Sequence, residues 1–538
     1  MVNVLKSSII TNAHSLLFHQ HKQTQGGQIM TQQLLPFKYE EEKKEKNLTG
    51  LGGLLLFLDL FAAMKLDSLI NRHMEVKKSK QGYRDDQILI SLILLNIAGG
   101  ESISDIQALE KDEGFCQILK SMELQGKTGR IRERIHRRWR KVQKNTVASP
   151  SSIFRYLLNF HNPTEELKRE AGKAFIPKSN EHLRKFADIN NELVHFVNRS
   201  NPETQATLDM DATLAQTYKK TALFSYKGYR AYQPFNVRWS EKNMLLYTEF
   251  RDGNVPAGHE QLRVLKESLN HLPESVEEVY VRSDSAGYQH ELMKYCDMGN
   301  HPRFGRIRFA ISSDITQEFK KSILLDKDIQ WHPIFKTVNG KIKKTRQEWA
   351  EVCYVSNKVA KSLKGCEYRY LAIREELEER ILPGMEDQKT LPFPTIDLEN
   401  KRYKLSALVS NIDWDGEKVI HWHRERMGKS EEVHGIMKTD LAGGRFPSSD
   451  YGINAAWWWI MILALNLQTI MKQLVLGGSW KYKRMKALRY HIINIPARII
   501  KDRGGKKYIV RVTQGHPSFN LLLKARIKIM ELGWLPDG

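Results

Sequence analysis

Residues 206–213 read ATLDMDAT and mark the point where the sequence pattern changes from helical to strand spacing. Asp209 and Asp211 alternate with Leu208 and Met210, so both carboxylates should project from one face of a strand. Further β-branched or aromatic runs, separated by Gly, Asn and Pro, follow at 229–239, 243–250 and 276–284. A helix-like segment comes after them, and this order of strands and helix predicts a mixed α/β sheet.

Other carboxylates farther along the chain lie at the ends of predicted strands or helices. Asp284 ends a strand-like run and precedes a glycine turn into a helix, whereas Glu431 and Glu432 open a helix that carries Lys438. Single residues of this kind are more often turn, cap or surface groups. Their order in a basic chain favours a shared site, because carboxylates from distant segments can hold two divalent cations roughly 3.5–4 Å apart. Such a pair of ions acts on phosphodiesters.

The composition indicates a polyanionic partner. The chain has 538 residues, 41% of them hydrophobic, and a formal net charge of +22, which points to nucleic acid first and to an acidic membrane surface second. The four cysteines form no C-x-x-C pair, which argues against a zinc site or a disulfide framework. We see no secretory signal, and expect a cytoplasmic protein without a membrane partner.

Two further segments allow more than one interpretation. The run AAWWWIMILAL at 455–465 is too short for a membrane span and predicts a buried helix, in which Trp457–Trp459 pack in the core rather than stack on a flipped base. His421 and His423 alternate at strand spacing, and a surface or DNA-contacting role is favoured over metal binding because no Cys or third His lies nearby in the sequence.

Residues 127–144 hold nine Lys or Arg residues and one acid, with Trp139 and two isoleucines interleaved. A serine-capped helix should follow at Ser149. The near-single sign of the charge favours contact with DNA phosphates over a merely solvated helix face. The predicted phosphate-binding residues are Arg130, Arg132, Arg134, Arg137, Arg138, Arg140 and Lys141.

Several motifs together resemble a known family. They are LDMDAT at 208–213, KGYRAYQPF at 227–235, VRSDSAGY at 281–288, RERMGKSEEVHGIMKTDLAGG at 424–444 and NAAWWWIMILALN at 454–466. They are similar to insertion-sequence transposases of the DDE class (group 1), in the branch with a β-rich insertion before the glutamate and a Y-R-E-K signature around it. The resemblance runs from about Met30 to the basic tail.

The resemblance implies particular roles for these residues. Asp211 matches the first catalytic aspartate, because the family motif is Asp-x-Thr, and Asp284 matches the second. Glu431 matches the glutamate, seven residues before Lys438. Asp209 and Glu432 remain alternates. Arg426 takes the place of the signature arginine with a spacing of five instead of four, and the tyrosine position has no Tyr.

The implied fold is α/β, an RNase H-like catalytic core interrupted by a β-rich insertion domain, with a mainly helical N-terminal DNA-binding region. The implied cofactors are two Mg²⁺ ions per active site, with Mn²⁺ as a substitute, bound by Asp211, Asp284 and Glu431, while Arg426 and Lys438 hold phosphate. The expected partners are the terminal inverted repeats, target DNA and a second copy in a homodimer. The alternatives are an RNase H-like nuclease without strand transfer and an inactive DNA-binding relative.

The expected organisation has six parts along the chain. A weakly ordered N-terminus precedes the helical region, the core is split by the insertion, and a basic C-terminal region ends the chain. The predicted bounds are 1–35, 36–200, 201–300, 301–410, 411–475 and 476–538.

Overall fold

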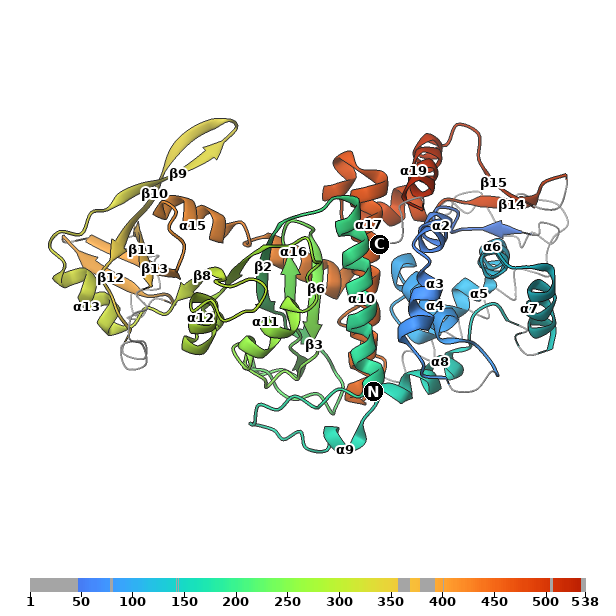
Figure 1. Ribbon diagram of the computed structural model, residues 1–538, viewed down its shortest axis with the longest axis horizontal. Helices are drawn as coiled ribbons and strands as arrows, with labels where there is room; N and C mark the ends of the chain where they lie inside the picture. Colours follow the sequence, from blue (N-terminus) through green and yellow to red (C-terminus); the bar gives the residue numbers. More distant parts are fainter. Residues whose placement is uncertain are drawn as a thin grey trace, which may run out of the picture. The chain divides into compact units, whose positions relative to one another are not determined.

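A computed structural model gives the arrangement of most of the chain (Figure 1). The residues it describes are 47–77, 81–141, 143, 145–356, 368–377, 392–399, 401–503 and 507–533. The predicted weakly ordered segment 1–35 lies outside them.

A large mixed sheet forms the centre of the described chain. Strand β2 (Gln205–Ala212) lies between β5 (Phe235–Trp239) and β7 (Glu278–Ser283), with β6 (Met244–Glu249) beyond β5 and β8 (Arg308–Ser313) beyond β7. β2, β7 and β8 are parallel, whereas β5 is antiparallel to both β2 and β6. The predicted mixed α/β sheet is therefore confirmed.

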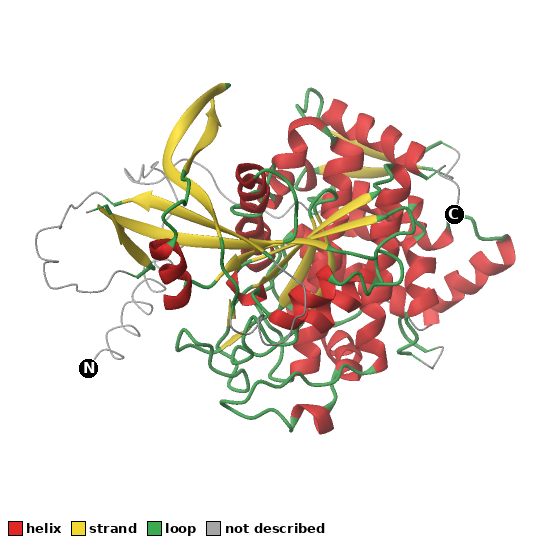
Figure 2. Ribbon diagram, turned by 60° about the vertical axis from the view of Figure 1, so that its left-hand side comes forward, coloured by secondary structure: helices red, strands yellow, loops and turns green. Residues whose placement is uncertain are grey.

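The β-rich stretch before the glutamate extends this same sheet. β13 (Lys401–Ser410) pairs with β8, and β11 (Arg369–Glu376), β10 (Lys341–Val352) and β9 (His332–Val338) follow in antiparallel order. β12 (Thr395–Leu398) pairs with the other part of β13, and α13 (Gln317–Leu325) connects β8 to β9. Figure 2 shows the strands continuing from the helix-covered part into this extension. Strand β8 falls inside the predicted insertion range 301–410, yet it continues the parallel strands of the core.

Two long helices pack on the other end of the sheet, beside β6. α10 (Glu181–Ser200) and α17 (Tyr451–Ile470) pack against each other and against β6 (Figure 1). Every residue of α17 is buried, including Trp457–Trp459, so the predicted core role of these tryptophans is confirmed. α17 with its π-helical continuation is long and apolar enough to cross a membrane, but 83% of its most apolar window is buried within the protein.

The N-terminal part is helical, as predicted, and the C-terminal part packs on it. Asp85 and Asp86 lie in the first turn of α4 (Asp85–Ala98), and Ser149 caps α8 (Pro150–Leu157) by accepting from the amide of Ser152. β1 (Leu48–Thr49) pairs with β14 (Ala497–Lys501), which also pairs with β15 (Tyr508–Val512). The helices of these parts are α2 (Leu55–Ala63), α3 (Leu66–His73), α4 (Asp85–Ala98), α5 (Ile106–Lys111), α6 (Glu113–Leu124), α7 (Gly129–Lys141), α8 (Pro150–Leu157), α9 (Pro163–Glu166), α18 (Met485–Leu488) and α19 (Phe519–Leu532).

The remaining helices lie between and after the strands. They are α11 (Gln261–Leu269), α12 (His290–Asp297), α15 (Gly416–Arg424) and α16 (Lys429–Gly435).

Two buried asparagines protect the edge strand β6. Asn466 Oδ1 accepts from the Leu245 amide at 3.0 Å, and its Nδ2 donates to the Leu245 carbonyl and to Asn190 Oδ1. Asn190 in turn donates to the carbonyls of Leu245 and Leu246. An unpaired strand edge would leave these backbone groups buried without partners, so the asparagines replace the second neighbouring strand that β6 lacks among the described residues.

Replacing Asn466 with alanine should lower the free energy of unfolding by about 3 kcal/mol, because the Leu245 amide and Asn190 Oδ1 lose buried hydrogen bonds. Thermal unfolding of the variant measures the effect. The exposed Asn270, substituted in the same way, serves as the control and should change the unfolding temperature little. Equal effects of the two substitutions would contradict this role for Asn466.

Candidate active site

The two predicted catalytic aspartates lie at the ends of adjacent parallel strands. The register of β2 and β7 pairs Met210 with Ser283, so Asp211 and Asp284 stand at the next positions along the two strands. Asp284 also accepts a hydrogen bond from the amide of Ala286, at the start of the 3₁₀ turn Ser285–Gly287. Because both strands run in one direction, the two carboxylates meet at the same edge of the sheet.

Asp209, the predicted alternate ligand, is buried and fully engaged by two arginines. Arg238 Nη1 donates to its Oδ2 at 3.0 Å, and Arg282 donates to both oxygens at 2.6 and 3.1 Å. The register places Arg238 and Arg282 directly beside Asp209 on β5 and β7. We call these three residues the Arg–Asp–Arg ladder. Asp209 is 1% exposed, so it acts as a structural anion between two cations.

The ladder extends to the helix that precedes the glutamate. Arg282 Nη1 donates to the Trp422 carbonyl at 2.6 Å and to Glu425 Oε2 at 3.2 Å, and its guanidinium lies over the Trp422 ring. Arg282 therefore fixes the end of α15 against β2 and β7. Neither Arg238 nor Arg282 was singled out from the sequence, where only the strand alternation of 282 with 284 could have pointed to it.

The structure corrects the interpretation of His421 and His423, the two histidines of the HWH motif, as alternating residues of a strand. They lie on α15 and not on a strand, and only His421 is exposed. His423 is buried and donates from Nε2 to the Ser283 carbonyl at 3.0 Å. Burial lowers the pKa of His423 to about 4, so it stays neutral and acts as a hydrogen-bond donor behind Asp284.

Negative charge accumulates around Asp211. Burial, together with the charges of Asp284 and Glu431, raises the pKa of Asp211 to about 7 against the opposing effect of Arg426. Arg426 Nη2 lies 3.5 Å from Asp211 Oδ2. The buried Nε of Arg426 has no hydrogen-bond partner among the described residues. The site therefore holds excess negative charge and a guanidinium with one unsatisfied donor beside Asp211.

The two candidate glutamates lie in the first turn of α16 but have different surroundings. The charge of Glu431 helps to raise the pKa of Asp211. Glu431 Oε2 also accepts from the Gly428 amide at 2.6 Å and so caps the helix on which Glu431 lies. Gly428 has φ +76°, a conformation that suits glycine and turns the chain into α16. The charge of Glu432 instead affects Lys472, where it opposes the lowering of the pKa by burial. Of the two glutamates, Glu431 is the one whose charge affects the pKa of Asp211.

Lys438 lies on a π-helical turn, Ile436–Asp440, that continues α16. Its Nζ donates to the Leu214 carbonyl at 3.4 Å, just past Asp211. Burial, and the nearby charge of Lys227, lower the pKa of Lys438, while Asp211 opposes this effect. His434, which the sequence did not suggest, is kept neutral because burial lowers its pKa to about 3, with Lys438 and Arg426 adding to the shift. π-helical turns of this kind are common at functional sites.

The donor set fits hard divalent cations. Carboxylate oxygens are the ligands that Mg²⁺ prefers, and a cation would offset the repulsion that raises the pKa of Asp211. Among the described residues no three His, Cys, Asp or Glu side chains stand ready around one ion, in keeping with the turn of Glu431 towards its own helix. Binding by Asp211, Asp284 and Glu431 together therefore requires the Glu431 side chain to leave its capping position.

The predicted DNA-binding arginines form a separate surface. They lie on α7, which packs against α6 and contains no buried residue. Arg138 is half-buried and bonds to the Gly82 carbonyl, so it holds α7 to the segment before α4. The others are exposed: Arg130, Arg132, Arg134, Arg137, Arg140 and Lys141.

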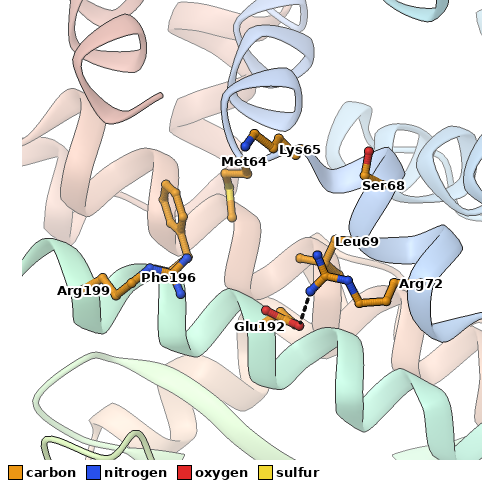
Figure 3. Close-up of a pocket in the computed structure, with 8 residues that line it drawn as sticks. All are labelled: Met64, Lys65, Ser68, Leu69, Arg72, Glu192, Phe196 and Arg199. Atoms are coloured by element: carbon orange, nitrogen blue, oxygen red, sulfur yellow. Dashed lines mark hydrogen bonds and ion pairs between the residues drawn. The ribbon is translucent and has the colours of Figure 1, made fainter. Parts of the chain in front are cut away.

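A hollow of about 230 Å³ lies between α2, α3 and α10 (Figure 3). Three cationic side chains line it, and one of them, Arg72, pairs with Glu192 at 3.2 Å. None of its residues comes from the strands or helix that carry the candidate catalytic carboxylates, so it is not part of that site. They are Met64, Lys65, Ser68, Leu69, Arg72, Glu192, Phe196 and Arg199.

Comparison with known proteins gives one family match. The model of the family described as Transposase DDE domain group 1 matches residues 40–534. No curated protein matches the chain. Among solved structures, the cryo-EM structure of the piggyBac transposase synaptic complex with hairpin DNA is similar over 82% of this chain and 79% of that chain, at 10% identity and a TM-score of 0.41.

The raised pKa of Asp211 makes a prediction about stability. Between its ordinary pKa of 3.8 and about 7 the folded protein binds more protons than the unfolded chain, so this group destabilises the fold increasingly as pH rises through that window. Asp211→Asn removes the cost, and should stabilise the protein by up to about 4 kcal/mol at pH 8 but little at pH 4. Thermal unfolding in EDTA measures both values. A gain that does not change with pH would show that Asp211 is not the titrating group.

Proposed function

Because this chain belongs to the family of the transposase DDE domain group 1, we propose that it is the transposase of a bacterial insertion sequence. It binds the terminal inverted repeats of its element and catalyses DNA strand cleavage and strand transfer. In this proposal β6, β5, β2, β7 and β8 form the RNase H-like core, and β9–β13 form the β-rich insertion before the glutamate.

One observation supports the proposal: two acidic residues end adjacent strands at one edge of the sheet, and a third, on α16, lies within electrostatic range of the first. Asp211 and Asp284 end adjacent parallel strands, and Glu431 acts on the charge of Asp211 from α16. A fourth acid, Asp209, lies two residues before Asp211 and is paired with the two arginines of the ladder. A buried carboxylate that repels its neighbours is typical of a catalytic site, where a bound cation supplies the missing charge.

In the proposed mechanism Asp211, Asp284 and Glu431 hold two Mg²⁺ ions, for which Mn²⁺ can substitute. The ions, when bound, activate a water or a 3′-hydroxyl and stabilise the leaving oxygen of the phosphodiester. Arg426 binds the scissile phosphate through its guanidinium, and its contact with Asp211 orients both groups. Lys438 adds positive charge to the same phosphate from the π-helical turn.

The proposed DNA partners follow from the charge of the chain, and the proposed homodimer follows from the family resemblance. The exposed arginines of α7 bind the backbone of double-stranded DNA at the terminal repeats, and target DNA enters the catalytic edge. Two element ends are brought together by a homodimer in the cytoplasm, without a membrane.

Cleavage of DNA that carries the ends of its own element should require all three acids. We expect near-complete loss of Mg²⁺-dependent cleavage and strand transfer in Asp211→Ala, Asp284→Ala and Glu431→Ala, with DNA binding retained, because each variant removes a proposed ligand. Glu432→Ala is the matched control, since Glu432 is the neighbouring acid that acts on Lys472 instead.

A second readout is independent of turnover. Mg²⁺ should raise the unfolding temperature of the wild type and of Glu432→Ala, but not of the three ligand variants. Cleavage by Glu431→Ala combined with loss in Glu432→Ala would reassign the ligand. Cleavage without strand transfer in the wild type would favour the nuclease, and neither activity would favour a DNA-binding relative.

The double variant Arg130→Ala with Arg134→Ala should weaken binding to duplex DNA of any sequence. These side chains lie one turn apart on α7, and each lost phosphate contact should reduce the slope of log affinity against log salt by about 0.9. Filter binding or fluorescence anisotropy over a range of salt concentrations measures this slope. Lys321→Ala with Lys327→Ala removes the same exposed charge at α13 and its end, and should have the smaller effect. Equal effects of the two double variants would contradict a specific role for α7.

A further inference from the structure

An exposed aromatic loop lies next to the catalytic edge. Residues 217–230 connect β3 (Ala215–Gln216) to β4 (Ala231–Tyr232), which pair as a short hairpin. Three large aromatic side chains of this loop face solvent: Tyr218 is 94% exposed, Tyr226 78% and Phe224 56%. Exposed aromatic residues grouped in one loop are unusual for a surface that has no ligand.

The loop backbone is held firmly from beneath, so the exposure of these rings does not come from a loose loop. The buried Asp252 accepts from the Leu223 amide, and Arg169, which is paired with Asp252, donates to the Thr221 carbonyl at 3.0 Å. Arg230 donates to the Ala222 carbonyl. The small residues Ala222 and Ser225 are buried while the rings between and beside them point outward.

The loop is basic and contains no acid. Lys219, Lys220, Lys227 and Arg230 lie among the aromatic residues. Two of these cations stand over the rings: Arg230 lies 4.5 Å from the centre of Phe224, and Lys227 lies 5.9 Å from the centre of Tyr226. Flat apolar rings combined with positive charge suit a ligand that has both aromatic faces and anionic groups, as a DNA strand does.

The position of the loop ties it to the candidate active site. It begins six residues after Asp211, and Lys438 donates to the Leu214 carbonyl at its base. Lys227, next to Tyr226, contributes to lowering the pKa of Lys438, while Asp211 acts on Lys438 in the opposite sense. The tip of the loop and the catalytic carboxylate therefore both lie within electrostatic range of the same lysine.

We propose that this loop is a stacking platform for an unpaired DNA base next to the scissile phosphate, with Tyr226 as the principal stacking residue. The inference rests on the proposed function, because it places the DNA strand at Asp211. The rings of Tyr218 and Phe224 provide further stacking surface along the strand, while Lys219, Lys220 and Lys227 contact its phosphates. Stacking on an aromatic side chain contributes about 1–3 kcal/mol per base.

The test uses the full-length protein and two DNA probes in EDTA, where no cleavage occurs. One probe is a duplex with a single-stranded 3′ overhang that contains 2-aminopurine, and the other is the same duplex with blunt ends. We expect Tyr226→Ala to weaken binding of the overhang probe by about 5- to 100-fold and to abolish the fluorescence quenching of 2-aminopurine, while binding of the blunt duplex stays within about twofold.

Two variants serve as controls. Tyr226→Phe keeps the ring and should retain both the affinity and the quenching. Tyr490→Ala removes a tyrosine of the same exposure, 79%, from the C-terminal part of the chain and should change neither. Thermal unfolding of each variant verifies that the fold is kept.

The following outcomes would overturn the proposal. Quenching that persists in Tyr226→Ala, or equal loss of both probes, excludes base stacking by this residue. A change in oligomeric state with unchanged DNA binding would show that the loop contacts a second copy of the chain. The proposed function is tested separately. It fails if the wild type shows no Mg²⁺-dependent cleavage, or if Asp211→Ala still cleaves.

Discussion

The buried charge of Asp209 sets the geometry on which the candidate site depends. A carboxylate that is 1% exposed is tolerated only when cations and hydrogen bonds replace the water it has lost. Arg238 and Arg282 do this from the neighbouring strands, so the charge fixes the register of β2 with β5 and β7. Because Arg282 also binds the end of α15, the same interaction positions the segment that leads to Arg426 and Glu431.

Two residues along β2, the charge balance is reversed. Asp211 has one arginine beside it and two acids nearby, and burial, together with the charges of those acids, raises its pKa to about 7. The two acids of this strand therefore have opposite roles. The charge of Asp209 is neutralised by arginines of the protein, whereas the charge of Asp211 is left for a bound cation to neutralise. The ion pairs of Asp209 with Arg238 and Arg282 hold the strands together. The strands therefore cannot move apart to relieve the repulsion between Asp211 and the nearby acids.

The sequence predicted what depends on local pattern. Strand alternation at Asp209 and Asp211, the strand end at Asp284 and the apolar run around Trp458 all lead to elements that the structure contains. It could not predict partners that are distant in the chain, such as Arg282, or the joining of β13 to β8. The HWH motif misled because three residues are too few to distinguish strand from helix spacing. Glu431 and Glu432 are neighbours that differ in the charged group each affects, Asp211 or Lys472, and no local pattern encodes this difference.

The aromatic residues show why burial, and not residue type, decides a role. The tryptophans of α17 have the largest stacking surfaces, yet their rings are enclosed, and Trp458 donates to Thr248 within the core. A base can stack only on a ring with an open face, and Tyr226 has one on a loop that is otherwise anchored. The hydrophobic cost of exposing that ring is offset only when a partner covers it. Its place beside Lys227 makes a nucleic-acid strand the partner whose chemistry fits.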